Sequence, residues 1–279
     1  MRVKLSGVNR FPGERGFLLG EESRERINRP TPAPPPPKSP RLRPETFIPN
    51  DTEIAQIARV RGISPAAVSL AVANGVLSVG TNRELPAYFL HGPGIFQAKR
   101  LDGGKWQLRD GGESKVDTYF PVKGFGIRCG INKDTKVVII TEGLVGLLEA
   151  VEAVLRAEDE SGECWEGVGV IAAYSKASVL SNKNATYLST RHVMILADAG
   201  EPGLKAAKGW RRAIKTAGGS ARIRQFVEGD LGDELKRSPG CPDYLTEFYR
   251  NTKMRTSTNP TPTPTQRTPH ETHDDRNSR

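Results

Sequence analysis

Cysteine is scarce in this sequence, and its spacing excludes one common kind of site. The three cysteines, Cys129, Cys164 and Cys241, lie far apart, and no CxxC or CxxH pair occurs. A structural zinc site needs closely spaced ligands of this kind, so no zinc is expected. An odd cysteine count without an apolar leader segment is typical of a reducing compartment, which predicts a cytoplasmic protein.

Long apolar runs and the commonest phosphate-binding loop are also missing. No stretch approaches the roughly 18 apolar residues of a membrane span, so no membrane partner is expected. The sequence GxxxxGK[ST] does not occur, which excludes a fused helicase motor of the P-loop type.

The excess of positive charge lies mainly at the two ends. The formal net charge is +9, of which residues 1–45 carry +5 and residues 251–279 carry +2. The first segment is rich in proline and basic, and the second alternates threonine with proline, so both are expected to be disordered. The first is interpreted as a spacer, or alternatively as a ligand for an aromatic groove or an arm touching nucleic acid through Arg41 and Arg43. An acidic partner such as nucleic acid is suggested by the pI near 9.6, although the ends account for most of that charge.

Residues 46–80 are expected to form a small helical hairpin. Asp51 is predicted to cap the first helix, and Gly62 to end it. Ser64, followed by proline, is predicted to start the second helix, which stops near Asn74. The second helix has no Arg, Lys or Gln that could reach base edges, so a packing hairpin is favoured over a DNA-reading one.

Residues 81–132 are expected to form a β-rich subdomain, with hairpin signals at the two Asp-Gly pairs at 102–103 and 110–111. Basic side chains alternate with aromatic ones here, which is typical of a surface that binds phosphates or stacks bases. A half-buried antiparallel sheet with a charged outer face explains the same pattern equally well. The side chains concerned are Phe96, Lys99, Arg100, Lys105, Trp106, Arg109 and Lys115.

Residues 133–238 alternate short apolar runs with helical segments. The expected strands are 136–141, 167–173, 193–197 and 221–227. Such alternation predicts a parallel α/β sheet with right-handed crossovers. A short closing helix is expected over 239–250.

Acidic residues follow three of these strands. Glu142 ends the first, Asp198 follows the third, and Asp230 and Asp233 follow the fourth. A single acid there is commonly a helix cap, but several at one sheet edge would repel one another. Because clustered carboxylates suit hard cations, the pattern predicts a divalent metal together with phosphate.

The sequences VVIITEGLVGLLEA, VMILADAGEPGLKAA and GDLGDEL resemble the Toprim domain, in particular that of bacterial, phage and plasmid primases. The resemblance covers roughly 133–238 and extends back over 46–132 through QAKRLDGGKW. It implies a Toprim-like parallel sheet flanked by helices, preceded by the hairpin and the β-rich subdomain. It also implies primer synthesis by nucleotidyl transfer from nucleoside triphosphates on single-stranded DNA. The resemblance further implies Mg²⁺ or Mn²⁺ as the cofactor and a separate replicative helicase as a partner. It implies a role in the replication of a mobile element or phage-like locus.

The resemblance also implies roles for individual residues. Glu142 matches the general acid/base or metal-associated glutamate, and Asp198 matches the first metal-binding aspartate. Asp230 and Asp233 fall on the late acidic turn. The expected contacts to the template backbone are Lys99, Arg100, Lys105 and Lys115.

Two acids of the family pattern are absent. Glycine stands at 146, three residues after Gly143, and at 200, where the second aspartate of Asp-x-Asp is usual. Glu201 is expected to substitute as a metal ligand. The alternative is a catalytically degenerate Toprim domain that binds nucleic acid or a replication partner. A third reading, an unrelated doubly wound domain for a small phosphorylated ligand, is disfavoured because no glycine-rich loop follows the first strand.

Overall fold

The computed structural model describes residues 43–108, 111–119, 122, 124–238, 240 and 242–257, with the side chains of the last five left out. The expectations for Arg41, Arg109, Cys241 and the tail beyond 257 therefore lie outside the described residues.

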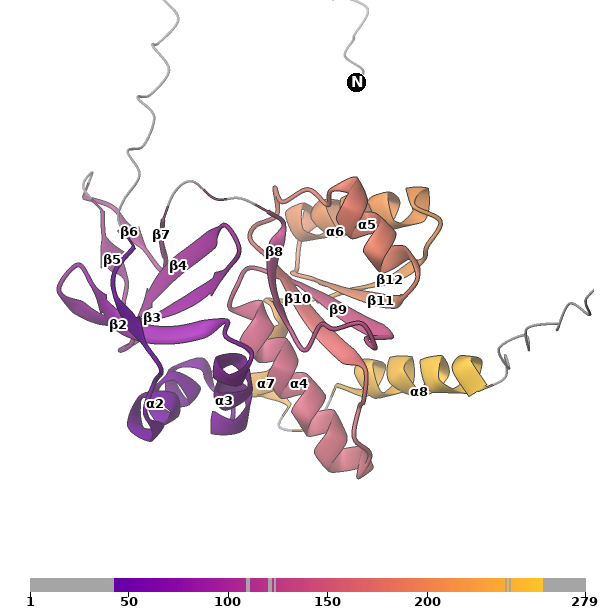
Figure 1. Cartoon of the computed structure of the whole chain (residues 1–279), viewed down its shortest axis with the longest axis horizontal. Helices are drawn as coiled ribbons and strands as arrows, with labels where there is room; N and C mark the ends of the chain where they lie inside the picture. The colour runs from indigo at the N-terminus through magenta and orange to yellow at the C-terminus, as the bar shows by residue number, and fades with distance from the viewer. Residues whose placement is uncertain are drawn as a thin grey trace, which may run out of the picture. The chain divides into compact units, whose positions relative to one another are not determined.

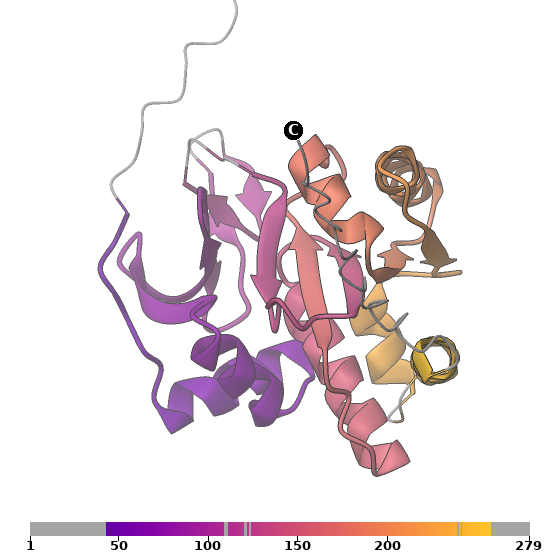
Figure 2. The ribbon, with the colours of Figure 1, turned by 45° about the vertical axis from the view of Figure 1, so that its right-hand side comes forward.

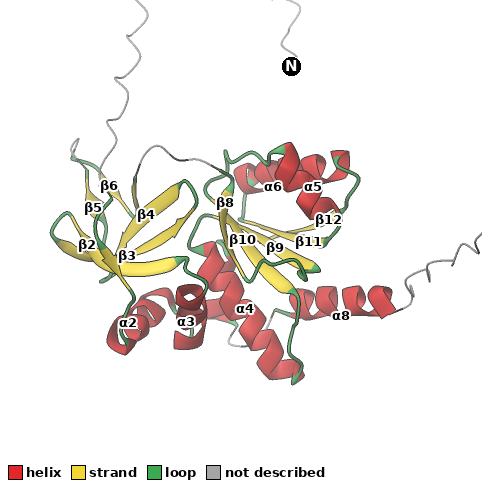
Figure 3. Cartoon of the chain, viewed as in Figure 1, coloured by secondary structure: helices red, strands yellow, loops and turns green. Residues whose placement is uncertain are grey.

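The chain has the expected α/β fold, built on two five-stranded sheets and a two-stranded ribbon (Figures 1 and 3). The first sheet and the ribbon consist of β1 Thr46–Phe47, β2 Leu77–Asn82, β3 Leu85–Gly92, β4 Ile95–Arg100, β7 Asp117–Thr118, and the ribbon strands β5 Trp106–Gln107 and β6 Glu113–Ser114. The second sheet consists of β8 Gly126–Cys129, β9 Val137–Glu142, β10 Val168–Ala173, β11 His192–Ala197 and β12 Ala221–Gln225. The helices are α2 Asp51–Arg61, α3 Pro65–Ala73, α4 Gly146–Ser161, α5 Asn182–Ser189, α6 Glu201–Thr216, α7 Leu231–Arg237 and α8 Asp243–Ser257. None of the helices within the described ranges has the length and apolar composition that a membrane crossing requires.

The helical hairpin begins one residue earlier than expected. Asn50, not Asp51, caps α2, in a capping box with Glu53. The expectation failed because Asp51 already has helical geometry, and only the residue before it can turn its side chain back to the free N–H groups. Gly62 ends the helix with φ +69°, and Ser64 caps α3 as expected.

The first sheet is an antiparallel meander of β1, β2, β3, β4 and β7. Phe96 and Trp106 are buried in a small core with Phe89 and Tyr119, and the Phe89 and Phe96 rings lie 5.0 Å apart. Arg43, which the alternative interpretation of the first segment assigned to nucleic acid, lies with its guanidinium carbon 5.0 Å from the centre of the Phe96 ring. The alternation of basic and aromatic residues is therefore the pattern of a half-buried sheet, and these aromatic rings are not free to stack on bases.

The second sheet has the strand order β12-β11-β9-β10-β8, with β8 antiparallel to its neighbour and the other strands parallel. Side chains alternate between its faces, so that Val137 and Ile139 face α4 while Val138 and Ile140 face α5 and α6. Figure 2 shows these helices on opposite sides of the sheet. Buried on both faces, the strands have the continuous apolar sequences expected of a parallel sheet.

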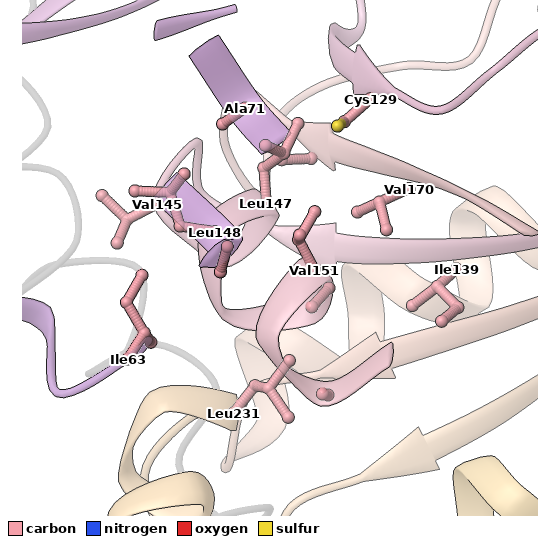
Figure 4. Close-up of a cluster of buried hydrophobic side chains, with 14 of the residues drawn as sticks. Ile63, Ala71, Cys129, Ile139, Val145, Leu147, Leu148, Val151, Val170 and Leu231 are labelled. Carbon is pink, nitrogen blue, oxygen red and sulfur yellow. The ribbon is translucent and has the colours of Figure 1, made fainter. Parts of the chain in front are cut away.

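The helical hairpin shares its core with the second sheet. Ala71 of α3 lies beside Leu147 of α4, and Ile139 and Val170 of the sheet continue the same cluster (Figure 4). The segments 46–80 and 133–238, expected as separate parts, are thus packed as one hydrophobic core.

Three boundaries differ from expectation. The strand β8 comes from the expected β-rich segment but pairs with β10 in the second sheet. The late acidic turn contains a helix, α7. The last helix runs through Ser257, so residues 251–257 are helical rather than disordered. This helix docks through Tyr249, whose ring stacks on that of Trp165 at 4.4 Å, a contact that no local pattern in the tail could indicate.

The stacking contact makes a testable contribution to stability. Tyr249→Ala should lower the free energy of unfolding by about 3 kcal/mol, because it removes a buried aromatic ring from the α8 interface. Urea denaturation monitored by circular dichroism would measure this. Arg250→Ala, on the exposed side of the same helix, is the control and should change stability little. Equal stability of the two variants would contradict the docking of α8.

Candidate functional site

The candidate site lies where the strand order of the second sheet reverses. The chain leaves β9 to form α4 on one face of the sheet and leaves the adjacent β11 to form α6 on the other face. In open α/β sheets such a switch point opens a crevice beyond the carboxyl ends of the strands, where ligands bind. Glu142 ends β9 and Asp198 directly follows β11, so the fold brings both acids to this edge.

A lysine contacts both of these acids. Lys176 Nζ lies 3.3 Å from Glu142 Oε1 and 3.8 Å from Asp198 Oδ2. Lys176 belongs to the turn after β10, in which the Ser178 N–H donates to the Ser175 carbonyl at 2.9 Å. Lys176 was not among the residues expected from the sequence, although its position directly after a strand of the same sheet was a usable signal.

Burial raises the pKa values of the two carboxyl groups. The pKa of Asp198 is raised to about 7, first by burial and then by the negative charge of Glu142, and Lys176 offsets only part of this. The pKa of Glu142 is also raised, chiefly by burial. The Glu142 side chain is 7% exposed, and its Oε2 has no hydrogen-bond partner among the described residues. A buried, unsatisfied carboxylate oxygen beside a second acid suits a bound cation.

The loop after β12 brings a third acid close to the pair. The Ala199 N–H donates to the Gly229 carbonyl at 2.9 Å, which holds this loop against the loop after β11. The charge of Asp230 raises the pKa of Asp198, so the two side chains interact electrostatically. Gly203 lets the first turn of α6 approach closely, because a Cβ there would lie 2.5 Å from the Asp198 carbonyl oxygen.

Asp230 and Asp233 also have a local structural role. The Asp233 N–H donates to Asp230 Oδ1 at 3.0 Å, and Asp233 Oδ2 accepts from the Asp230 N–H at 3.4 Å. This capping box starts α7 and accounts for Asp233 without any ligand.

The two glycines at expected acidic positions have structural reasons. A Cβ at Gly146 would lie 2.8 Å from Thr141 Oγ1, so that position has no room for a carboxylate. Gly200 has φ +89° and ψ 171°, a backbone conformation essentially restricted to glycine. Glu201 is the exposed first residue of α6, and among the described residues no ion pair joins it to Lys176, the cation that contacts Glu142 and Asp198.

The expected template contacts divide into three groups. Arg100 pairs with Asp102, and Lys105 Nζ lies 2.7 Å from Glu113 Oε2, so acids of the same surface neutralise both. Lys115 is exposed. Lys99 is half-buried, and burial lowers its pKa to about 8.

A partly buried ion pair, not expected from the sequence, joins two helices near the site. Arg61 of α2 pairs with Glu149 of α4, whose side chain is 4% exposed. The charges of Lys99 and Asp230 also act on Glu149. The available signal was an acid at 149 among the apolar residues that follow the first expected strand.

The described residues contain no group of three or more His, Cys, Asp or Glu side chains spaced as a metal cluster. The pair Glu142 and Asp198 nevertheless fits Mg²⁺, which proteins commonly hold through one or two carboxylates together with substrate phosphates.

Comparison with known proteins gives similarity at the level of structure alone. No protein-family model matches the sequence, and no curated protein matches it. The zinc-binding and RNA polymerase domains of the Aquifex aeolicus primase are similar with 18% identity and a TM-score of 0.44, over 71% of this chain and 55% of that chain. A DNA primase domain from Pseudomonas aeruginosa is similar with 13% identity and a TM-score of 0.38, over 67% of this chain and 58% of that one.

The chain thus spans little more than half the length of these two primase structures. At TM-scores below 0.5, the similarity does not establish a shared activity.

The raised pKa of Asp198 predicts a pH-dependent stability. The folded protein holds this proton up to about pH 7, whereas the unfolded chain releases it near its ordinary value of 3.8, so stability falls as pH rises through that window. Asp198→Asn should therefore become progressively more stable than the wild type as pH rises from 4 to 7, with the difference vanishing below pH 4. Urea denaturation at several pH values would measure it. A difference independent of pH would contradict the raised pKa.

Proposed function

We propose that this chain is a primase-type Toprim protein that binds single-stranded DNA and joins nucleotides by metal-dependent transfer, in replication of a mobile element or phage-like locus. One observation carries the proposal. Glu142 and Asp198 meet at the switch point of a parallel sheet, and Glu142 Oε2 is buried there without a hydrogen-bond partner among the described residues. The sequence resemblance to Toprim domains supplies the reaction class.

Glu142 and Asp198 would hold Mg²⁺ or Mn²⁺, and the negative charge of Asp230 would add to the attraction. The bound ion would neutralise and orient the triphosphate of the incoming nucleotide. Glu142, with its raised pKa, is suited to accept a proton at Oε2 from the attacking hydroxyl. Lys176 would turn its ammonium from the carboxylates to the phosphates of the nucleotide.

A second candidate function is a catalytically degenerate Toprim domain that binds nucleic acid or a replication partner. The contact of the Lys176 ammonium with both carboxylates favours it, because the lysine provides the positive charge that a metal would otherwise supply. Thr141 also fills the space where a further acid would stand at Gly146. The two candidates differ in whether a divalent cation can displace Lys176.

Primer synthesis on single-stranded DNA tests the proposed activity. Wild-type protein with Mg²⁺ or Mn²⁺ should extend labelled nucleotides into short products, and Glu142→Gln should reduce the rate by roughly a hundredfold or more because it removes one ligand charge and the proton acceptor. Glu166→Gln, an exposed acid near the start of β10 at the opposite sheet edge, is the matched control and should keep full activity. Full activity in Glu142→Gln would refute the catalytic assignment, and inactivity of the wild type would favour the binding module.

Competition between Lys176 and a metal can be measured directly. Lys176→Met should bind Mn²⁺ at least about tenfold more tightly than the wild type, because the two carboxylates lose their internal cation. Electron paramagnetic resonance of free Mn²⁺ gives the affinity without any need for turnover. Lys183→Met, on α5 and exposed, is the control. Unchanged or weaker Mn²⁺ binding in Lys176→Met would show that the lysine does not occupy the cation position.

A further inference from the structure

The outer face of α6 carries a dense stripe of positive charge. Five exposed cations fall within about a third of the helix circumference at 3.6 residues per turn. These residues, called the α6 stripe, are Lys205, Lys208, Arg211, Arg212 and Lys215. The acid of this helix, Glu201, lies in its first turn. No ion pair within the described part of the chain joins a residue of the stripe to an acid.

The fold gives no reason for so many like charges together. Cations three or four residues apart, such as Lys208 and Arg212, repel one another and weaken the helix. The opposite face of the sheet shows the reverse composition, since α4 contains one arginine and five acids. The two longest helices on opposite faces of the sheet, α4 and α6, thus differ in the sign of their charge, and α6 is the basic one.

The helix that carries the stripe begins at the candidate site. Helix α6 starts three residues after Asp198, and Gly203 in its first turn lies against the Asp198 carbonyl. From Lys205 to Lys215 the helix extends about 15 Å at 1.5 Å per residue. A polymeric anion whose end lies at Asp198 can therefore continue along the stripe.

A membrane surface does not fit this helix. A helix that lies in a bilayer needs an exposed apolar face opposite its basic one. The apolar face of α6, including Trp210 and Ile214, is buried against the sheet, and Trp210 Nε1 donates to the Ser178 carbonyl at 2.7 Å. The stripe therefore offers charge without an apolar anchor, which suits a hydrated polyanion.

We propose that the α6 stripe binds the sugar–phosphate backbone of nucleic acid next to the candidate site. This places the main electrostatic contact on α6, in contrast to Arg100 and Lys105, whose charges are already paired. Contacts of this kind are independent of base sequence and depend strongly on salt. The choice of nucleic acid over another polyanion rests on the proposed function.

A charge-neutralising triple variant tests the inference. Lys208→Gln, Arg212→Gln and Lys215→Gln together remove three charges while keeping helix propensity nearly constant. The matched control removes three exposed charges elsewhere, through Arg128→Gln, Lys133→Gln and Lys136→Gln. Fluorescence anisotropy of a labelled oligothymidylate with the full chain, in EDTA and without nucleotides, gives the affinity over a range of salt. Thermal melting followed by circular dichroism verifies that both variants are folded.

The stripe variant should bind roughly tenfold or more weakly at low salt, and its slope of log affinity against log salt should be shallower by about 2, at 0.7 per phosphate contact. The control variant should match the wild type in both affinity and salt slope. Wild-type affinity and slope in the folded stripe variant would overturn the inference. Absence of wild-type binding would overturn it too, as would polyglutamate displacing the oligonucleotide at equal charge, which would indicate an acidic protein partner.

The two proposals can fail separately, because this binding assay contains no metal and no nucleotide. Loss of binding in the stripe variant with an inactive wild type would support the stripe and reject primer synthesis. Retained binding in the stripe variant, with synthesis that depends on Glu142, would reject the stripe alone.

Discussion

The close approach of two partly buried acids, Glu142 and Asp198, is the constraint on which the site depends. Parallel pairing of β9 and β11 holds the strand ends side by side, so the repulsion cannot be relieved by moving either strand. A proton on Asp198, whose pKa is raised to about 7, relieves the repulsion, and so does a nearby cation. In this structure the cation is Lys176, whose ammonium contacts both carboxylates. Whether a divalent metal replaces it decides between a catalytic site and a binding module.

The scaffold behind this edge is itself held by charge as well as apolar packing. Arg61 of the helical hairpin pairs with Glu149 of α4 inside the protein. A buried pair of this kind adds little net stability, but loss of one partner leaves a costly unpaired charge. It fixes how the hairpin sits on α4, and the charge of Asp230 reaches Glu149 from the site side. The hairpin and the candidate site are thus electrostatically connected.

The parallel strands and the edge that carries the acids were predictable from the sequence, because β-branched runs and acids at strand ends are local signals. The role of Asp233 in a capping box was not predictable, because a capping box and a metal ligand use the same residue type at the same position. The sequence also could not show whether Lys99, Arg100 and Lys105 are free to contact a template. Their burial and their pairing depend on strands and turns that only the folded chain brings together.

The sequence by itself determined the α/β class, the order of strands and helices in 133–238, and the arrival of Glu142 and Asp198 at one sheet edge. These follow from periodicity and chain direction, which are local properties. Only the tertiary structure decided that Lys176 contacts both acids and that Thr141 leaves no room for a side chain at Gly146. It also decided that β8 pairs with β10 in the second sheet. Each of these depends on distances between segments far apart in the chain, which no local pattern encodes.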